Sequence, residues 1–248
     1  MCNWQGLKNA LVLVLACTAL NAGAETITMA AEDDWYPFSA SIDGKASGLA
    51  VDVVREAYKA VGITVDFKAV PYARCMYLVQ AGLVTGCFNT TQNAELAKAF
   101  MWPKAPLYRA KCLIYAKRES SDEKLTSTEL EGKLVGVTLG YEYGDAFDNN
   151  SKINKDSAPG DLNGFKKLAA GRVDYMVAYE KVANHLFSNK SADLLGLFKP
   201  VGEVATNALF ISFKRGDAAG LKMMDAFDRG MKAINKNGAY KAILKKWN

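Results

Sequence analysis

The sequence predicts an α/β protein built from two similar lobes, each a mostly parallel sheet flanked by helices. The first observation is a repeated helix-to-strand joint, at residues 78–84 (LVQAGLV) and 167–173 (KLAAGRV). In each copy a glycine follows an amphipathic helix, and an apolar run typical of a buried strand comes next. The second observation is that strand and helix patterns alternate along the chain, which favours parallel sheets. Two lobes imply a cleft between them, and such clefts bind small ligands.

The first 24 residues are predicted to be a signal peptide outside this fold. Lys8 is their only charged residue, residues 10–20 are apolar, and Ala22-Gly23-Ala24 is typical of a cleavage site. The apolar segment is shorter than the about 20 residues that a membrane span needs. Cys17 allows a second interpretation, a lipoprotein anchored through that cysteine. Because Leu15 fits a lipoprotein processing site poorly, we favour a soluble protein exported to the periplasm.

The mature chain begins with a first series of strands and helices. Residues 26–30 alternate as a strand, and the polar and aromatic residues 32–38 predict a loop. Apolar residues at helical spacing predict a helix over 50–61, and residues 63–68 alternate as a second strand. After Pro71 we expect a helix over 72–81, a strand over 84–89 followed by Thr90 and Thr91, and a longer strand over 109–117.

A charged linker at residues 118–129 precedes a second series. It contains a strand over 134–138, a turn at 140–144 that leads into a helix, and a polar segment at 149–159 that predicts a loop. The helix over 161–170 and the strand over 173–178 form the second copy of the joint, and a helix around 181–187 follows. A strand over 209–213 and helices over 217–236 and 239–247 complete the chain.

Charge and short motifs argue against several classes of function. The formal net charge of +5 is mild, and basic residues are not interleaved with aromatic ones, so nucleic acid is not an expected partner. The sequence has no H-E-x-x-H, G-x-x-x-x-G-K or paired C-x-x-C, and we expect neither a metal nor a cofactor. His185 is the single histidine, which leaves no Ser-His-Asp set.

The cysteines of the mature chain are odd in number. Cys75, Cys87 and Cys112 allow at most one intramolecular disulfide and one free thiol in an oxidising compartment. Cys87 and Cys112 lie in apolar runs, so we interpret them as small buried residues rather than metal ligands.

The order of several short motifs resembles that of a known family. Residues 35–38 (WYPF) form an aromatic-Pro-Phe loop, residues 48–53 (GLAVDV) resemble a Gly-Phe-Asp-Val-Asp helix start, and residues 130–137 (LEGKLVGV) resemble Leu-Lys-Gly-Lys-x-Val-Gly-Val. The two Ala-Gly joints match in spacing, and residues 237–247 resemble the family's closing segment. In this order the motifs resemble the bacterial periplasmic solute-binding proteins of the polar amino acid type, family 3, which deliver solutes to ABC transporters.

This resemblance implies a two-lobed, periplasmic-binding-protein-like fold of type II with two crossing segments. Lobe 1 would comprise residues 25–109 and 206–248, and lobe 2 residues 110–205. The crossings would lie near residues 107–110 and 204–207. A small-molecule ligand would bind in the cleft, and the lobes would close over it by hinge motion. The implied partner is the membrane permease of an ABC transporter, and the protein is expected to be a monomer.

The resemblance also places candidate ligand-binding residues in lobe 1. Trp35 and Tyr72 fall where the family has the aromatic walls of its cleft, which suit the apolar stem or the cationic head of a ligand. Asn89, Thr90 and Thr91 come at the end of a buried strand, where ligands bind in open α/β sheets. These three residues are equally suited to capping a helix.

The sequence departs from the family at the charged positions. Leu96 aligns with the arginine that pairs with the ligand carboxylate in members that bind α-amino acids. Tyr179 stands where those members have an aspartate for the ligand amino group. The small hydroxyl residues that cap the ligand in lobe 2 are replaced by Tyr141, Glu142 and Tyr143.

Two arginines are candidates to replace the missing cation. Arg74 lies two residues after Tyr72 on the same predicted helix, and Arg109 adjoins the first crossing. The alternative for each is an ordinary surface position, and the choice stays open at this point.

We therefore expect a periplasmic protein that captures a small polar or aromatic-compatible solute other than a standard α-amino acid. One alternative is a periplasmic enzyme on the same fold, resembling a dehydratase, with Glu142 or Glu180 as a general acid. Another is a partner protein that presents bound ligand to a membrane sensor.

Overall fold

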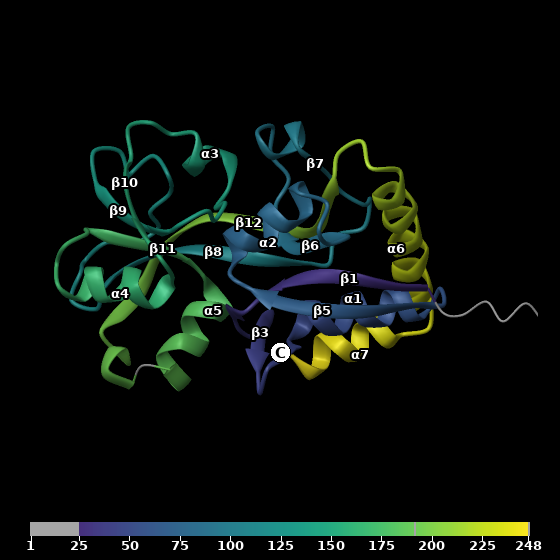
Figure 1. The fold of residues 1–248 in the computed structure, drawn as a ribbon. Coiled ribbons are helices and arrows are strands. Elements are labelled where there is room, and N and C mark those ends of the chain that lie inside the picture. The colour runs from purple at the N-terminus through teal and green to yellow at the C-terminus, as the bar shows by residue number, and fades with distance from the viewer. Residues whose placement is uncertain (1–24, 191, 248) are drawn as a thin grey trace, which may run out of the picture.

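The fold is organised by one curled nine-stranded sheet that runs through both halves of the molecule (Figure 1). The computed structural model describes residues 25–190 and 192–247, so the predicted signal peptide and Cys17 lie outside the described residues. The strand order is β10-β9-β11-β8-β12-β6-β1-β5, and β7 (Phe100–Met101) pairs with β12. Within the described residues, no helix is long and apolar enough to cross a membrane.

Two long antiparallel strands carry the chain between the halves of the sheet. They are β8 (Tyr108–Lys117) and β12 (Phe198–Lys214), which pair from Phe198–Lys117 to Leu209–Tyr108. Figure 1 shows them running side by side through the middle of the molecule. We call lobe 1 the part built on β5, β1, β6 and the carboxyl end of β12, and lobe 2 the part built on β10, β9, β11, β8 and the amino end of β12. The residue limits predicted for the lobes stay a prediction.

Lobe 1 has helices on both faces of its sheet. The parallel strands β1 (Glu25–Glu32), β5 (Ile63–Val70) and β6 (Gly86–Thr90) form its centre. Because successive residues of β1 point to opposite faces, Ile27 and Met29 pack on α1 (Leu49–Lys59) and α6 (Ala218–Lys236), whereas Ala30 packs with α2 (Tyr72–Gln80). Helix α7 (Ala239–Lys246) packs on α1 and α6.

Lobe 2 repeats this arrangement on a smaller scale. Strands β9 (Leu134–Thr138), β10 (Asn154–Ala158) and β11 (Tyr175–Tyr179) are parallel, and α4 (Asp161–Ala169) packs on them. Alternate residues of β11 face opposite cores, so Met176 packs with α4 whereas Val177 faces the other side. The lobe is completed by α3 (Asp145–Asp148), α5 (Glu180–His185) and the short helical turns Leu186–Lys190 and Ala192–Leu194.

The structure corrects several sequence predictions. The predicted loop at 149–159 contains β10, an edge strand whose mostly exposed residues lack the apolar pattern of a buried strand. The predicted strand 209–213 is the end of β12. The first half of β12 was not predicted, because Pro200, Gly202 and several polar residues interrupt the apolar pattern of a strand. The loop after β1 contains the small sheet β2 (Asp34–Trp35), β3 (Ser39–Ile42) and β4 (Lys45–Ser47). Thr90 is the last residue of β6 rather than the first residue after it.

The cysteine prediction is confirmed, and the pairing is now defined. Cys75 on α2 and Cys87 on β6 form a disulfide with Cα atoms 5.6 Å apart. Cys112 is the free thiol of the described residues, and burial raises its pKa well above the usual value. Cys87 is buried, as expected, but it is also covalently linked.

Candidate ligand-binding site

Two connected spaces lie where the lobes meet. The larger is a cavity of about 630 Å³ lined by residues of both lobes, which we call the interlobe cavity. The smaller is an aromatic cage of about 10 Å³, close to the volume of one water molecule. The cage is lined by Glu32, Trp35, Tyr72, Asn89, Tyr141, Glu142 and Tyr179. Glu32, Tyr72 and Tyr141 line both spaces.

The aromatic loop of lobe 1 places Trp35 in the cage. Leu49 and Ala50, at the start of α1, donate backbone hydrogen bonds to the carbonyls of Pro37 and Phe38. This close approach requires Gly48, which has φ 137° and where a Cβ would lie 2.3 Å from the Phe38 carbonyl oxygen. The Phe38 ring contacts the Trp35 ring at 4.8 Å between centroids. The loop therefore holds the Trp35 ring in place through its contact with the Phe38 ring.

The strand β6 places Asn89 in the cage through an uncommon backbone conformation. Asn89 has φ 69°, a left-handed conformation that asparagine tolerates better than most residues. Its Oδ1 accepts a 2.6 Å hydrogen bond from the Tyr108 hydroxyl, and Tyr108 stacks on Phe38 at 4.6 Å between ring centroids. The amide is thereby held in one orientation with its Nδ2 group buried.

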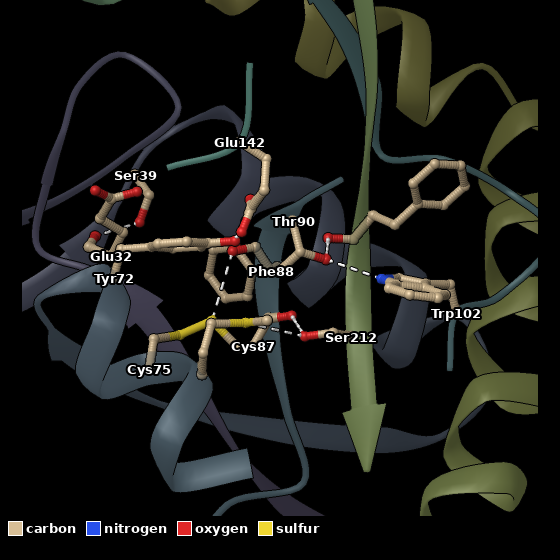
Figure 2. Close-up of a disulfide and its surroundings, with 12 residues drawn as sticks. Glu32, Ser39, Tyr72, Cys75, Cys87, Phe88, Thr90, Trp102, Glu142 and Ser212 are labelled. Carbon is tan, nitrogen blue, oxygen red and sulfur yellow. Dashed lines mark hydrogen bonds between the residues drawn. A yellow bond between two sulfur atoms is a disulfide. The ribbon is translucent and has the colours of Figure 1, made fainter. Parts of the chain in front are cut away.

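Helix α2 places Tyr72 in the cage. Tyr72 is the first residue of α2, and Cys75, one turn later, is bonded to Cys87 on β6. Figure 2 shows the disulfide beneath Tyr72, with the Tyr72 hydroxyl directed at Glu142. The covalent link fixes the beginning of α2 against β6, the strand that carries Asn89.

The lobe 2 side of the cage is a turn whose backbone is held by the side chains of Asp148 and Asn207. The backbone N–H groups of Tyr143 and Gly144 donate to the Asp148 carboxylate, and Asn207 Nδ2 donates to the Tyr143 carbonyl. Gly144 has φ 123°, and a Cβ there would lie 3.1 Å from the Cβ of Ala205 on β12. The turn is therefore packed against a crossing strand.

Side chains of this turn reach across to lobe 1. The Tyr72 hydroxyl donates a 2.8 Å hydrogen bond to Glu142 Oε2, and the Tyr141 hydroxyl donates to Glu32 Oε1. The Tyr141 ring meets the Tyr72 ring edge-on at 5.5 Å between centroids. The lobes are thus in contact, and Tyr141, Glu142 and Tyr179 form the lobe 2 side of the cage.

Burial of these carboxyl groups shifts their pKa values upward. Desolvation raises the pKa of Glu142 to about 7 and that of Asp161 to about 6. The pKa of Glu32 is well above its usual value because of burial, although the hydrogen bond from Tyr141 lowers it in part. In the part of the chain that the structure describes, none of these three carboxyl groups forms a salt bridge.

Two hydrogen-bond donors in the cage have no acceptor among the described residues. They are Trp35 Nε1 and Asn89 Nδ2. Trp35 and Asn89 are only 2% and 5% exposed, so an acceptor for these groups has to be held inside the cage. Buried donors without partners are rare in native proteins, and here both belong to residues that line the same small space.

The structure brings together only some of the predicted site residues. Besides the cage residues, Tyr143 packs inside lobe 2, where its hydroxyl accepts a hydrogen bond from the Thr138 N–H. Thr90 accepts from Trp102 Nε1, and Thr91 is buried outside both spaces. Arg74 is exposed and lines neither the cage nor the interlobe cavity. Arg109, the other candidate cation, is likewise exposed on β8.

Sequence reasoning missed two acidic residues and one positioning group. Glu32 was placed at the start of a loop, yet it ends β1 and carries a buried carboxyl group. Asp161, the first residue of α4, accepts a hydrogen bond from the Thr138 hydroxyl and lines the interlobe cavity. Asn207 on β12 donates to the Tyr179 hydroxyl. The signal available for Glu32 was its place at the carboxyl end of a buried strand.

The site has the chemistry of a binding pocket for a small solute. It combines aromatic faces, buried carboxyl groups and buried N–H donors, and its combined size is in the usual range for ligand pockets. Across the described ranges, no group of three or more His, Cys, Asp or Glu residues is arranged to hold a metal ion.

Comparison with known proteins gives a consistent result. Residues 27–248 match the family of bacterial extracellular solute-binding proteins, family 3. The arginine-binding extracellular protein ArtP of Bacillus subtilis is 23% identical over 94% of this chain and 91% of its own. An ancestral arginine-binding protein bound to arginine superposes with a TM-score of 0.75 at 23% identity, covering 90% of this chain and 97% of that one.

A solved structure with a different role has the same fold. It is a histidine kinase sensor domain described as similar to periplasmic binding proteins, with a TM-score of 0.79 and 21% identity over 90% of this chain and 95% of that one. At this level of identity the structural matches show the fold alone.

Proposed function

The chain belongs to family 3 of the bacterial extracellular solute-binding proteins, and on this premise we propose that it captures a small solute between its lobes and delivers it to the membrane permease of an ABC transporter. The family binds small molecules and works with ABC transporters outside the cytoplasm. We propose that this chain acts as a monomer in the periplasm after cleavage following Ala24. Mass spectrometry of the exported protein should find Glu25 at its amino terminus, and a lipid-modified Cys17 there would contradict this.

The aromatic cage is the observation that carries the proposal. It is built from both lobes, so a solute held in it contacts both at once. A solute that contacts both lobes stabilises the closed arrangement over the open one by its extra contacts. The two buried N–H groups without acceptors supply binding capacity that the protein itself does not use.

We propose that the solute is polar or aromatic-compatible and is not a standard α-amino acid. Leu96 is half-buried beside the core that α2 covers, with its backbone N–H bonded to Asn93 Oδ1, and it has no charge to offer a carboxylate. Tyr179 offers a hydroxyl group in place of an aspartate, and it already donates to the Glu142 carbonyl. Calorimetry should therefore find weak binding of the standard amino acids, and a submicromolar dissociation constant for any of them would contradict this specificity.

A thermal-shift screen of the mature protein tests solute capture itself. A solute at about 100 times its dissociation constant should stabilise the fold by about 2.7 kcal/mol. Trp35→Ala and Tyr141→Ala should each weaken binding of a solute found in this way, because each removes an aromatic wall of the cage. Arg118→Ala, at an exposed residue that follows β8 and lines neither the cage nor the interlobe cavity, serves as a control. A solute whose affinity is unchanged in both cage variants would place the site elsewhere.

A second candidate function is catalysis, which is favoured by the Glu142 carboxyl group. A buried carboxyl with a pKa of about 7 beside a tyrosine hydroxyl has the property that a general acid needs. The test is recovery of the solute after long incubation with the protein. Quantitative recovery of unchanged solute would rule out the enzyme, whereas a product absent from the Glu142→Gln variant would establish it.

A further inference from the structure

The charges around the cleft are of one sign. Glu32 and Glu142 line the aromatic cage, and Asp33, Asp34 and Asp161 line the adjoining interlobe cavity. Of the described residues that line the two spaces, none is a lysine or an arginine, and His185 lines the interlobe cavity but not the cage. The Glu142 carboxyl group accepts a hydrogen bond from the Tyr72 hydroxyl, and the Glu32 carboxyl group accepts one from the Tyr141 hydroxyl. Among the described residues, the carboxyl groups of Glu32 and Glu142 thus have no cationic partner, and a cationic ligand can supply one.

The buried N–H donors give a second, independent constraint. Trp35 Nε1 and Asn89 Nδ2 are unpaired, and both residues are more than nine-tenths buried in the cage wall. Burying an N–H donor without a partner is energetically unfavourable, because its hydrogen bond to water is lost. A ligand acceptor that bonds to the donor removes this cost. The ligand should thus present an acceptor to lobe 1 as well as a positive charge to the carboxyl groups.

The acceptor is better neutral than charged. A ligand carboxylate placed in the cage would lie beside two buried carboxyl groups, and the Trp35 and Asn89 groups are neutral donors that do not compensate its charge. A carbonyl or amide oxygen satisfies the same donors without that repulsion. The cation, in turn, gains from the faces of Trp35, Tyr72 and Tyr141.

Resting on the proposed function, we propose that the ligand of this cleft is a small organic amine with a net positive charge, one neutral acceptor such as an amide oxygen, and no free carboxylate. The ammonium group pairs with Glu142 and Glu32, and the acceptor receives the N–H groups of Trp35 and Asn89. The cage holds only about 10 Å³ in this structure, so the ligand enters while the lobes are apart and takes the place of the cross-lobe bonds of Tyr141 and Glu142 in a wider cage. The rest of the ligand extends into the interlobe cavity, which shares the walls Glu32, Tyr72 and Tyr141.

Three compounds of matched chain length test this assignment by calorimetry. Lysinamide carries two amines and a neutral carbonyl, 1,5-diaminopentane carries two amines and no acceptor, and lysine carries two amines and a carboxylate. We expect lysinamide to bind at least about tenfold more tightly than lysine, which corresponds to about 1.4 kcal/mol. We expect 1,5-diaminopentane to bind more weakly than lysinamide, because it leaves the two donors unpaired.

Variants identify the groups responsible. Glu142→Gln and Glu32→Gln should each lower the affinity for lysinamide at least tenfold and reduce its advantage over lysine. Glu123→Gln removes the same charge from an exposed position outside the cleft and should leave both affinities unchanged. Thermal unfolding of each variant checks that the fold is intact.

The possible failures have separate meanings. Lysine binding as tightly as lysinamide would overturn the charge assignment and leave solute capture standing. Absence of binding for all three compounds would also overturn it, while a neutral or acidic compound that binds in the broader thermal-shift screen would keep the proposed function. A preference for lysinamide that persists in both Gln variants would place the cation elsewhere.

Discussion

The two walls of the cage are held in place in different ways. The lobe 1 wall is fixed within its own lobe: Trp35 rests on Phe38, Asn89 is bonded to Tyr108, and the helix that begins at Tyr72 is tied to β6 by the disulfide. In the lobe 2 wall the backbone of the turn is fixed, but Tyr141 and Glu142 make their terminal hydrogen bonds to lobe 1. The contacts that fix Trp35, Asn89 and the start of α2 thus lie within lobe 1, whereas the ends of the Tyr141 and Glu142 side chains are held across the interface.

This difference suggests that the two walls have different roles in ligand binding. A preformed wall costs little conformational entropy when a ligand arrives, so it suits the first contact. A wall that depends on closure couples ligand binding to the relative position of the lobes.

The largest expected effect is loss of the disulfide from the lobe 1 wall. Cys75→Ser combined with Cys87→Ser should lower the free energy of unfolding by about 2–4 kcal/mol, because the crosslink restricts the unfolded chain. It should also weaken solute binding, since α2 and β6 carry Tyr72 and Asn89. Urea titration measures the stability. The wild-type protein with reductant is the matched control, and equal stability with and without reductant would show that the link contributes nothing.

The second prediction concerns pH and the lobe 2 wall. In the closed arrangement the pKa of Glu142 is raised to about 7 from an ordinary 4.5, so closure favours the protonated carboxyl group. The ligand-free lobes should therefore be most closed below about pH 4.5 and should open as the pH rises through about 7, with a free-energy change of up to about 3 kcal/mol. The Tyr72 hydroxyl and the Asp148 carboxylate face this group, and Asp161 and Glu32 shift in the same direction.

Small-angle scattering of the ligand-free protein at pH 5 and pH 8 measures this opening. Glu142→Gln cannot ionise and should reduce the change in radius of gyration. The idea fails if the wild-type protein has the same radius at both pH values, or if the variant responds as strongly as the wild type.

A smaller effect is expected from Trp35→Phe, which alters the lobe 1 wall without removing its aromatic face. The substitution deletes the unpaired Nε1 donor, so solute binding should weaken by about 1–1.5 kcal/mol, roughly tenfold. The pH response should persist because Glu142 is untouched. Calorimetry measures the affinity, and unchanged affinity would mean that the ligand does not use this donor.

The smallest effect is expected from Tyr179→Phe, at the junction of the lobe 2 turn and the crossing strand. The Tyr179 hydroxyl donates to the Glu142 carbonyl at 2.8 Å and accepts from Asn207 Nδ2. Its loss should weaken solute binding by about 0.5–1.5 kcal/mol through a looser turn. Tyr175→Phe, whose hydroxyl bonds to Asp122 away from the cleft, is a matched control. If Tyr179→Phe and Tyr175→Phe change the solute affinity equally, the Tyr179 hydroxyl has no specific role in positioning the turn that carries Glu142.

Local patterns predicted the regular elements well, and the places where they failed have physical causes. The helix predicted over 72–81 is α2 (Tyr72–Gln80), because helical periodicity and the preceding Pro71 act over a few residues. The edge strand β10 and the first half of β12 were missed because their stability comes from distant partners, Leu134–Thr138 and β8, rather than from their own apolar pattern.

The site was predictable only in part for the same reason. Trp35, Tyr72 and Tyr141 could be named from family positions, and they do lie together. Glu32 acquires its importance from Tyr141, which is 109 residues away in sequence. The unpaired donors Trp35 Nε1 and Asn89 Nδ2 could not be predicted from the sequence, because whether a donor finds an acceptor depends on the folded structure.

Closure on a solute is tested most directly by the radius of gyration of the mature protein at pH 8, measured by small-angle scattering with and without the tightest-binding solute from the thermal-shift screen. The lobes should be apart without solute, and saturation should produce a more compact particle of unchanged mass. The Tyr141→Ala variant should compact less at the same occupancy, because it lacks a cross-lobe hydrogen bond. A radius that stays constant while calorimetry shows saturation would contradict capture between two closing lobes.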